Sequence, residues 1–434
     1  MKRTALSQLA RRTPESAISW LMKLTLERPD LISLAAGFTD NDSLPVNETR
    51  ELLDDILRSP RTGRPALQYG ATNGDAALRE MTAAHLVRGD VAGQTPSSDT
   101  VQQALPPADL SARMLITSGS QQLLYITTEA LCDEGDIVLV EDPTYFVYLG
   151  ITQGRGLRTR GVRLLDDGID LEHLEQVLDE LKQSGELPRV KMLYLVTYFQ
   201  NPTGRTTSFA KKAAALAMLQ KYERAAGHPI YLLEDAAYRE LRFAGEDIPS
   251  ALATAHAGRV IYAGTYSKPF ATGARVGFGV LPQDVFTAAS RIKGNHDFGT
   301  ANLLQQLLSR AMSSGAYEKY LPVLRQRYAA KAATMVRAIR EHFPTSVKWA
   351  EPGGGLYVWA ELPTRVKSGV KSSLFGNALK SNVLYVPGEL CYCDDAARRK
   401  PNREMRISFG GARATDIPEG IKRLATVMRR CGVR

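Results

Sequence analysis

The chain has 434 residues, of which 44% are hydrophobic and 23% charged, a composition typical of a soluble globular protein with a large domain and a smaller one. Its net charge of +9 suits anionic ligands, but no zinc-finger spacing, RNA-binding signature or dense basic run is present, so we expect no nucleic-acid partner. The basic N-terminus lacks an apolar signal core, and no apolar stretch approaches the roughly 18 residues of a membrane span, so we expect a cytoplasmic protein without a membrane partner.

Short apolar runs alternate with helical patterns through the first two thirds of the chain. Strands are predicted at 137–140, 192–197, 230–233, 260–263 and 276–280, and helices at 123–131 and 209–226. This alternation predicts an α/β domain with a mostly parallel central sheet flanked by helices. The strands at 260–263 and 276–280 are close in the chain, so they could also pair antiparallel. Residues 89–110, rich in Pro, Ser, Asp and Gln, are expected to form a loop or a partly ordered insertion.

The C-terminal third follows a different pattern. A long helical stretch at 301–342 precedes predicted strands at 347–350, 356–360, 383–386 and 405–409 and a terminal helix at 417–430. This order predicts a smaller α+β domain. We therefore divide the chain into a large domain, residues 62–310, and a small domain made of residues 1–61 and 311–434.

The four cysteines are too few for a disulfide framework in a chain of this length. Cys391 and Cys393 lie two residues apart and no second pair accompanies them, so we expect no metal site. A packing role is the simplest interpretation, and a reactive pair near a ligand pocket is the alternative.

Polar residues follow three predicted strands at the point where each strand ends. Asn201 follows the strand at 192–197, Asp235 and Tyr238 follow the strand at 230–233, and Lys268 follows the strand at 260–263. The carboxyl ends of parallel strands share one edge of a sheet, where ligands bind. Each residue alone is equally typical of a turn, a helix cap or core packing. Together they indicate a ligand site at this edge.

Lys268 lies in the run Thr265-Tyr266-Ser267-Lys268, seven residues before Arg275. A lysine amine can form a Schiff base with the aldehyde of pyridoxal phosphate. The hydroxyl groups of Thr265 and Ser267 can donate to the phosphate, and the guanidinium of Arg275 can clamp it with two hydrogen bonds. The run therefore predicts a binding site for pyridoxal phosphate.

Two further segments suit the same cofactor. Ser120 and Gln121 open a helix after the apolar run 114–116, and the free N–H groups at the start of a helix suit a phosphate. Tyr145 follows the strand at 137–140, where its ring is placed to stack on a planar ligand; core packing is the alternative.

The set of motifs resembles the fold-type I, pyridoxal-phosphate-dependent aminotransferases of class I/II. Within that family the chain is most similar to the branch that holds 2-aminoadipate, kynurenine and aromatic aminotransferases. The resemblance runs from about Ser16 to the end of the chain. It implies pyridoxal 5′-phosphate as cofactor.

The resemblance also implies a role for each matching residue. Lys268 corresponds to the Schiff-base lysine, which also moves the proton at the substrate α-carbon. Asp235 corresponds to the carboxylate that keeps the pyridine nitrogen protonated, and Asn201 and Tyr238 to the pair that hydrogen-bonds the phenolic oxygen of the ring. Tyr145 corresponds to the residue that stacks on the cofactor ring. The residues that bind the phosphate correspond to Ser120, Gln121, Thr265, Ser267 and Arg275.

Substrate residues follow in the same way. Arg406 corresponds to the arginine that binds the substrate α-carboxylate, with Gly37 and Asn201 beside it. Relatives that accept acidic side chains carry an arginine in the first helix, where this chain has Ser19 and Trp20. An apolar or aromatic substrate side chain is therefore favoured.

Tyr69 corresponds to a tyrosine that reaches the phosphate of the neighbouring subunit, which implies a homodimer with shared active sites. The expected reaction is transamination between an α-amino acid and a 2-oxo acid such as 2-oxoglutarate. A lyase or other carbanion reaction on an amino acid is the alternative, because the residues that bind the cofactor are the same for these reactions and for transamination. A more remote alternative is a regulator that senses pyridoxal phosphate behind a DNA-binding module. The residues before Ser16 are too few for such a module, a winged helix.

Overall fold

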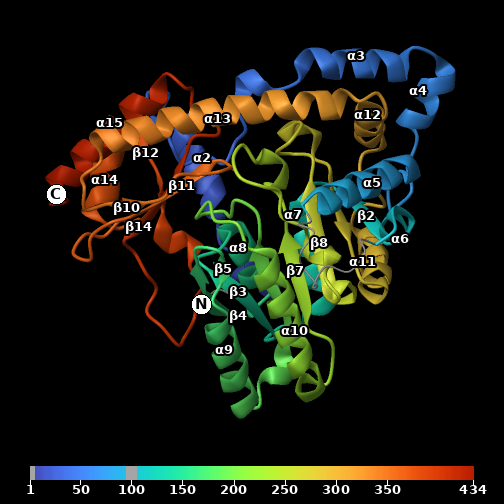
Figure 1. Ribbon diagram of the computed structural model, residues 1–434, viewed down its shortest axis with the longest axis horizontal. Coiled ribbons are helices and arrows are strands. Elements are labelled where there is room, and N and C mark those ends of the chain that lie inside the picture. Colours follow the sequence, from blue (N-terminus) through green and yellow to red (C-terminus); the bar gives the residue numbers. More distant parts are fainter. Residues whose placement is uncertain (1–4, 94–104) are drawn as a thin grey trace.

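The computed structural model describes residues 5–93 and 105–434. Its larger sheet has eight strands in the order β2-β9-β8-β7-β6-β3-β4-β5 (Figure 1). The bounds are β2 Met114–Thr117, β3 Ile137–Asp142, β4 Arg158–Leu165, β5 Gly168–Ile169, β6 Val190–Val196, β7 Tyr231–Asp235, β8 Val260–Thr265 and β9 Gly277–Val280.

Most of this sheet is parallel. Strands β8, β7, β6, β3 and β4 all run in one direction, whereas β9 is antiparallel to both of its neighbours and β5 is antiparallel to β4. The central strands are almost wholly buried because helices cover the sheet, which explains their continuous apolar runs. The predicted α/β class with a mostly parallel sheet is confirmed. The antiparallel pair that the sequence left open is β8 with β9.

Fifteen α-helices occur among the described residues. They are α1 Gln8–Arg12, α2 Ala17–Glu27, α3 Val46–Leu57, α4 Pro60–Leu67, α5 Ala76–Ala92, α6 Pro107–Ala112, α7 Ser120–Leu131, α8 Phe146–Gly154, α9 Leu171–Gln183, α10 Phe209–Ala226, α11 Gln283–His296, α12 Asn302–Ser313, α13 Ala316–His342, α14 Ser373–Lys380 and α15 Asp416–Arg430. Helix α10 has the predicted bounds, because Ser208 caps its first turn and Gly227, at φ +79°, ends it.

A smaller antiparallel sheet has the order β10-β11-β14-β13, with bounds β10 Lys348–Trp349, β11 Tyr357–Glu361, β13 Val386–Pro387 and β14 Glu404–Ser408. Separately, β1 (Ile32–Ser33) pairs in parallel with β12 (Val383–Leu384). The N-terminal segment therefore pairs with the C-terminal part of the chain. The strand predicted at 383–386 was wrong as one element, because its two halves pair in different sheets.

Two other predictions need correction. The helical stretch at 301–342 is two helices, α12 and α13, separated at Gly315, which has a φ of +75°. The loop predicted at 89–110 was wrong at both ends, because α5 continues to Ala92 and α6 begins at Pro107; residues 94–104 of that prediction lie outside the described residues. The 27-residue helix α13 spans the molecule from the larger sheet to the smaller one (Figure 1).

Candidate active site

A cavity of about 570 Å³ lies at the carboxyl ends of β6, β7 and β8. The parallel strands bring residues from distant parts of the chain to this edge of the sheet. All predicted site residues except Tyr69 line it: Gly37, Ser120, Gln121, Tyr145, Asn201, Asp235, Tyr238, Thr265, Ser267, Lys268, Arg275 and Arg406.

Lys268 reaches into the cavity from the loop after β8. Its Nζ donates to the carbonyl oxygen of Gly37 at 2.7 Å. Burial, together with the nearby positive charges of Arg406 and Arg275, lowers the pKa of Lys268 from 10.5 to about 8. The amine therefore has a substantial neutral fraction near neutral pH, as a nucleophile or proton acceptor requires.

Asp235 ends strand β7 and is 3% exposed. Its carboxylate accepts hydrogen bonds from the Tyr194 hydroxyl at 2.9 Å and from the Ala237 N–H at 3.1 Å. Burial raises the pKa of Asp235 from 3.8 to about 6, because no cationic side chain among the described residues pairs with it. A buried carboxylate that faces a cavity in this way suits a ligand with a cationic N–H.

Arg406 lies on β14 and is 1% exposed. Its two Nη atoms donate to Asn201 Oδ1 at 2.7 Å and to the Ala35 carbonyl oxygen at 2.6 Å. Asn201 Nδ2 in turn donates to the Tyr238 hydroxyl at 3.2 Å, and that hydroxyl lies 3.0 Å from the hydroxyl of Tyr357. The Nε of Arg406 has no protein partner although it is buried. The guanidinium is thus held rigidly with bonding capacity left for an anion.

Backbone N–H groups and hydroxyl groups in another part of the cavity suit an anion. Helix α7 begins at Ser120 with no side-chain cap, so its first N–H groups are free. A Cβ on Gly277 would lie 2.4 Å from Ser120 N, so only glycine lets β9 approach this turn. Arg275, in the left-handed region at φ +50°, donates to Ser267 Oγ at 3.3 Å. No carboxylate among the described residues forms an ion pair with Arg275.

Helix α2 supplies an apolar wall that the sequence did not reveal. Ile18 and Met22, one helical turn apart, line the cavity. Trp20 lies on another side of the helix and packs on Phe375, with ring centroids 5.8 Å apart. The apolar spacing i, i+4 was the available signal, but it does not say what that face covers. Tyr357, also missed, closes the site beside Gly37, where a Cβ would meet its hydroxyl at 2.7 Å.

Three sequence-predicted residues lie apart from the cavity. Tyr69 is 83% exposed and its ring packs edge-on against Phe298, with centroids 5.4 Å apart. Cys391 and Cys393 are buried and do not line the cavity. Burial raises the pKa of Cys391 to about 12, so its thiol is inert and a packing role fits it.

The family of the chain follows from its similarity to known proteins. The family described as "Aminotransferase class I and II" matches residues 29–424. The chain belongs to this family. Its members use pyridoxal 5′-phosphate, so this aminotransferase has the cofactor that Lys268 and its neighbours predicted.

Individual relatives agree with this family. Aromatic-amino-acid aminotransferase 1 of Thermococcus litoralis is 31% identical over 95% of this chain and 91% of its own. The 2-aminoadipate transaminase of Thermus thermophilus is 33% identical over 97% of this chain and 95% of its own. The crystal structure of Pyrococcus horikoshii kynurenine aminotransferase has a TM-score of 0.86 and 32% identity, covering 98% of this chain and 97% of that chain. The predicted family and branch are confirmed.

The residues of the cavity fit pyridoxal phosphate. The uncompensated carboxylate of Asp235 suits a pyridinium N–H, and the open start of α7 with Arg275 suits a phosphate. Lys268 lies in the same cavity with a lowered pKa, as an amine that binds an aldehyde requires. In the described part of the chain no cluster of His, Cys, Asp or Glu could hold a metal ion, and no helix there is long and apolar enough to cross a membrane.

Proposed function

We propose that this aminotransferase moves the amino group of an α-amino acid with an apolar or aromatic side chain to a 2-oxo acid such as 2-oxoglutarate. The observation that carries this proposal is a single cavity in which Lys268 and Arg406 face the apolar wall of Ile18 and Met22. Pyridoxal phosphate, when bound, supplies an electron sink for the electron pair that the substrate α-carbon retains when it loses its proton. The printed names of the relatives, aromatic-amino-acid and kynurenine aminotransferase, point to the same side chains.

Lys268 is the proton carrier of the proposed reaction. With a pKa near 8, its Nζ can take a proton from the substrate α-carbon and return it two atoms along, to the carbon on the far side of the amino nitrogen. Asp235, held by Tyr194, keeps an anionic charge at the ring nitrogen. Asn201 and Tyr238 would hold the phenolic oxygen of the bound cofactor, and Tyr145 would lie against its ring.

Arg406 positions the substrate by its α-carboxylate. Its guanidinium is fixed by Asn201 and Ala35, so little rotational freedom is lost when a carboxylate binds. The Gly37 backbone lies beside it. The phosphate group is assigned to Ser120, Gln121, Thr265, Ser267 and Arg275.

The oligomer, the domains and the location are part of the same proposal. Tyr69 is exposed in the single chain, which supports a homodimer in which it reaches the phosphate of the other subunit. Residues 62–310 are assigned to the cofactor-binding domain, with residues 1–61 and 311–434 in the small domain. We keep the prediction of a cytoplasmic location.

The visible absorbance of the cofactor tests the reaction. Single amino acids are added to the pyridoxal-phosphate-loaded protein without any oxo acid. Conversion of the cofactor to its pyridoxamine form by phenylalanine and leucine, with a weak response to aspartate, is the expected result. Release of ammonia and pyruvate without pyridoxamine formation would instead establish a lyase.

A further inference from the structure

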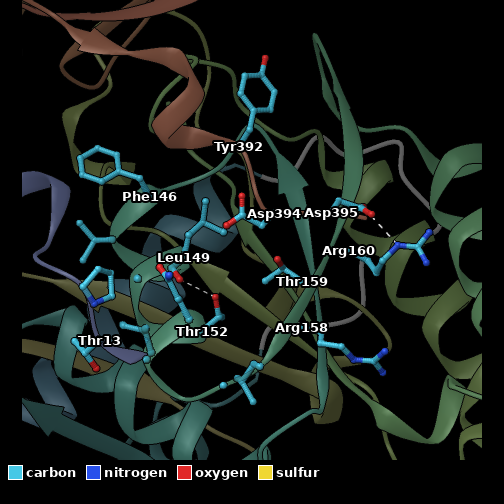
Figure 2. Close-up of a pocket in the computed structure, with 18 of the residues that line it drawn as sticks. Thr13, Phe146, Leu149, Thr152, Arg158, Thr159, Arg160, Tyr392, Asp394 and Asp395 are labelled. Atoms are coloured by element: carbon cyan, nitrogen blue, oxygen red, sulfur yellow. Dashed lines mark hydrogen bonds and ion pairs between the residues drawn. The ribbon is translucent and has the colours of Figure 1, made fainter. Parts of the chain in front are cut away.

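A second cavity, of about 1000 Å³, adjoins the active-site cavity along helix α8 (Figure 2). Three residues line both cavities: Gln121, Phe146 and Val147. Phe146 and Val147 are the first two residues of α8, so the cavities meet at the start of this helix. The second cavity then follows α8 towards Arg158 on β4.

The same boundary is visible on helix α2. Ala17 lines the second cavity and Ile18 lines the active-site cavity, although the two residues are neighbours. The segment from Leu9 to Ala17 therefore borders the second cavity and continues directly into the wall of the first. Gln121, Phe146 and Val147 therefore form the wall that the two cavities share.

Apolar side chains form much of the second cavity's lining near helix α8, beside the polar residues Gln121, Glu15 and Ser16. Leu149 and Leu390 line the cavity there, and Tyr125 and Tyr392 add aromatic rings. Figure 2 shows Phe146, Leu149 and Tyr392 around the same space. Gly150 leaves room there, because a Cβ on it would have no atom within 4 Å.

The charged lining residues on β4 and at 394–400 already have partners, whereas the exposed Glu15 forms no ion pair among the described residues. Arg160 pairs with Glu180 at 2.8 Å, and Lys400 pairs with Asp394 at 2.6 Å. Arg158 pairs with Glu186 at 2.5 Å. A charged ligand would have to break one of these pairs, whereas an apolar chain would not. The cavity therefore favours an uncharged, apolar occupant.

We propose that the second cavity receives the distal part of the substrate side chain. The enzyme then accepts 2-amino acids whose apolar side chains are longer than that of phenylalanine, such as 2-aminodecanoate. This inference rests on the proposed transamination and names the class of substrate for the same site. Each methylene group that enters the second cavity is removed from water, which increases kcat/KM roughly threefold per group.

A chain-length series tests the proposal in the wild-type enzyme. kcat/KM is measured for straight-chain 2-amino acids from norvaline to 2-aminododecanoate. It is expected to rise along the series beyond the length of norleucine. A value that falls beyond norleucine overturns the inference. Failure of the shortest members and of phenylalanine to react would instead contradict the proposed transamination itself.

Gly150→Trp locates the effect. Gly150 lines the second cavity and not the first, one helical turn after Phe146 and Val147, so the indole should exclude a long side chain from the second cavity. Norvaline, which does not extend beyond the first cavity, should keep its kcat/KM within about twofold, while 2-aminodecanoate should lose about tenfold or more. Gly150→Ala, which adds one methyl group at the same helical position, is the matched control and should retain both substrates. An equal loss for both substrates, or no loss for either, would show that the second cavity is not used.

Binding provides a readout that does not depend on turnover. A 2-hydroxy acid carries no amino group and cannot react, so its dissociation constant can be measured by calorimetry. 2-Hydroxydecanoate should bind the wild-type protein more tightly than 2-hydroxypentanoate does. Gly150→Trp should remove this difference, and persistence of the difference would overturn the proposal.

Discussion

Arg406 Nη1 donates to Asn201 Oδ1 at 2.7 Å, which joins strand β14 of the smaller sheet to the loop after β6 of the larger sheet. The second Nη atom holds the backbone of Ala35, near β1, at 2.6 Å. Three separate parts of the chain therefore fix one guanidinium. A carboxylate site of this kind exists only when the smaller sheet, the larger sheet and the N-terminal segment are packed together.

Arg406→Lys should impair substrate binding while leaving the cofactor bound. Lysine keeps the positive charge but lacks the two Nη donors of the guanidinium. Either Asn201 Oδ1 or the Ala35 carbonyl oxygen therefore loses its hydrogen bond. We expect KM for the amino acid to rise about tenfold to a hundredfold, from the usual strength of hydrogen bonds to charged groups. Steady-state kinetics and cofactor absorbance measure the two effects. Arg413→Lys, on the exposed surface, is the control; loss of cofactor in Arg406→Lys would show a different role.

Lys268→Ala should abolish transamination, because it removes the amine that carries the proton. We expect the half-reaction to slow by about 1000-fold or more, the usual effect of losing a positioned acid–base group. Single-turnover absorbance measures the rate, and pyridoxal phosphate should still bind. A wild-type rate in this variant would refute the assignment of the whole site.

Asp235→Asn should change how the stability of the cofactor-free protein depends on pH. Burial raises the pKa of Asp235 from 3.8 to about 6, so over that range the folded protein binds more protons than the unfolded chain and loses stability as pH rises. The loss amounts to about 3 kcal/mol. Urea unfolding at several pH values should show this decline in the wild type and a flatter curve in Asp235→Asn. Parallel curves would mean that Asp235 titrates normally.

Gly277→Ala should destabilise the protein and weaken cofactor binding. The new methyl group would lie 2.4 Å from Ser120 N and 2.6 Å from the Gly119 carbonyl carbon, so β9 and the start of α7 must separate. We expect a loss of about 2 kcal/mol in unfolding free energy and a weaker affinity for pyridoxal phosphate. Gly273→Ala, in the same cavity, meets no atom within 4 Å and should behave as wild type.

Mixed dimers should reveal whether Tyr69 acts across subunits. Co-expression of Lys268→Ala chains with Tyr69→Ala chains gives hybrids in which one site has both residues intact if Tyr69 comes from the other subunit. Activity should then exceed that of either variant alone. A mixture of Lys268→Ala chains with Asp235→Asn chains is the control. Each of these residues lines the site of its own chain, so both sites of the mixed dimer carry a change and no activity is restored. The absence of restored activity in the first mixture would contradict a shared active site.

The site residues of the larger sheet could be predicted from the sequence. Asp235 ends one apolar strand, and Asn201 and Lys268 lie in the loops after two others; parallel strands bring such positions to one edge whatever the details of packing. The partners that tune these residues could not be predicted in the same way. Tyr194 lies within the predicted strand at 192–197, and only the packed sheet places its hydroxyl 2.9 Å from Asp235.

The sequence by itself determined the α/β class and the family and pointed to Lys268 as the candidate cofactor lysine, because short apolar runs predict strands and local motifs indicate chemistry. Only the tertiary structure decided that Ile18 and Met22 line the active-site cavity, that Trp20 packs on Phe375 and that residues 383–386 divide between two sheets. It also decided that a second cavity adjoins the first at Phe146. These features depend on contacts between segments far apart in the chain, which local periodicity does not encode.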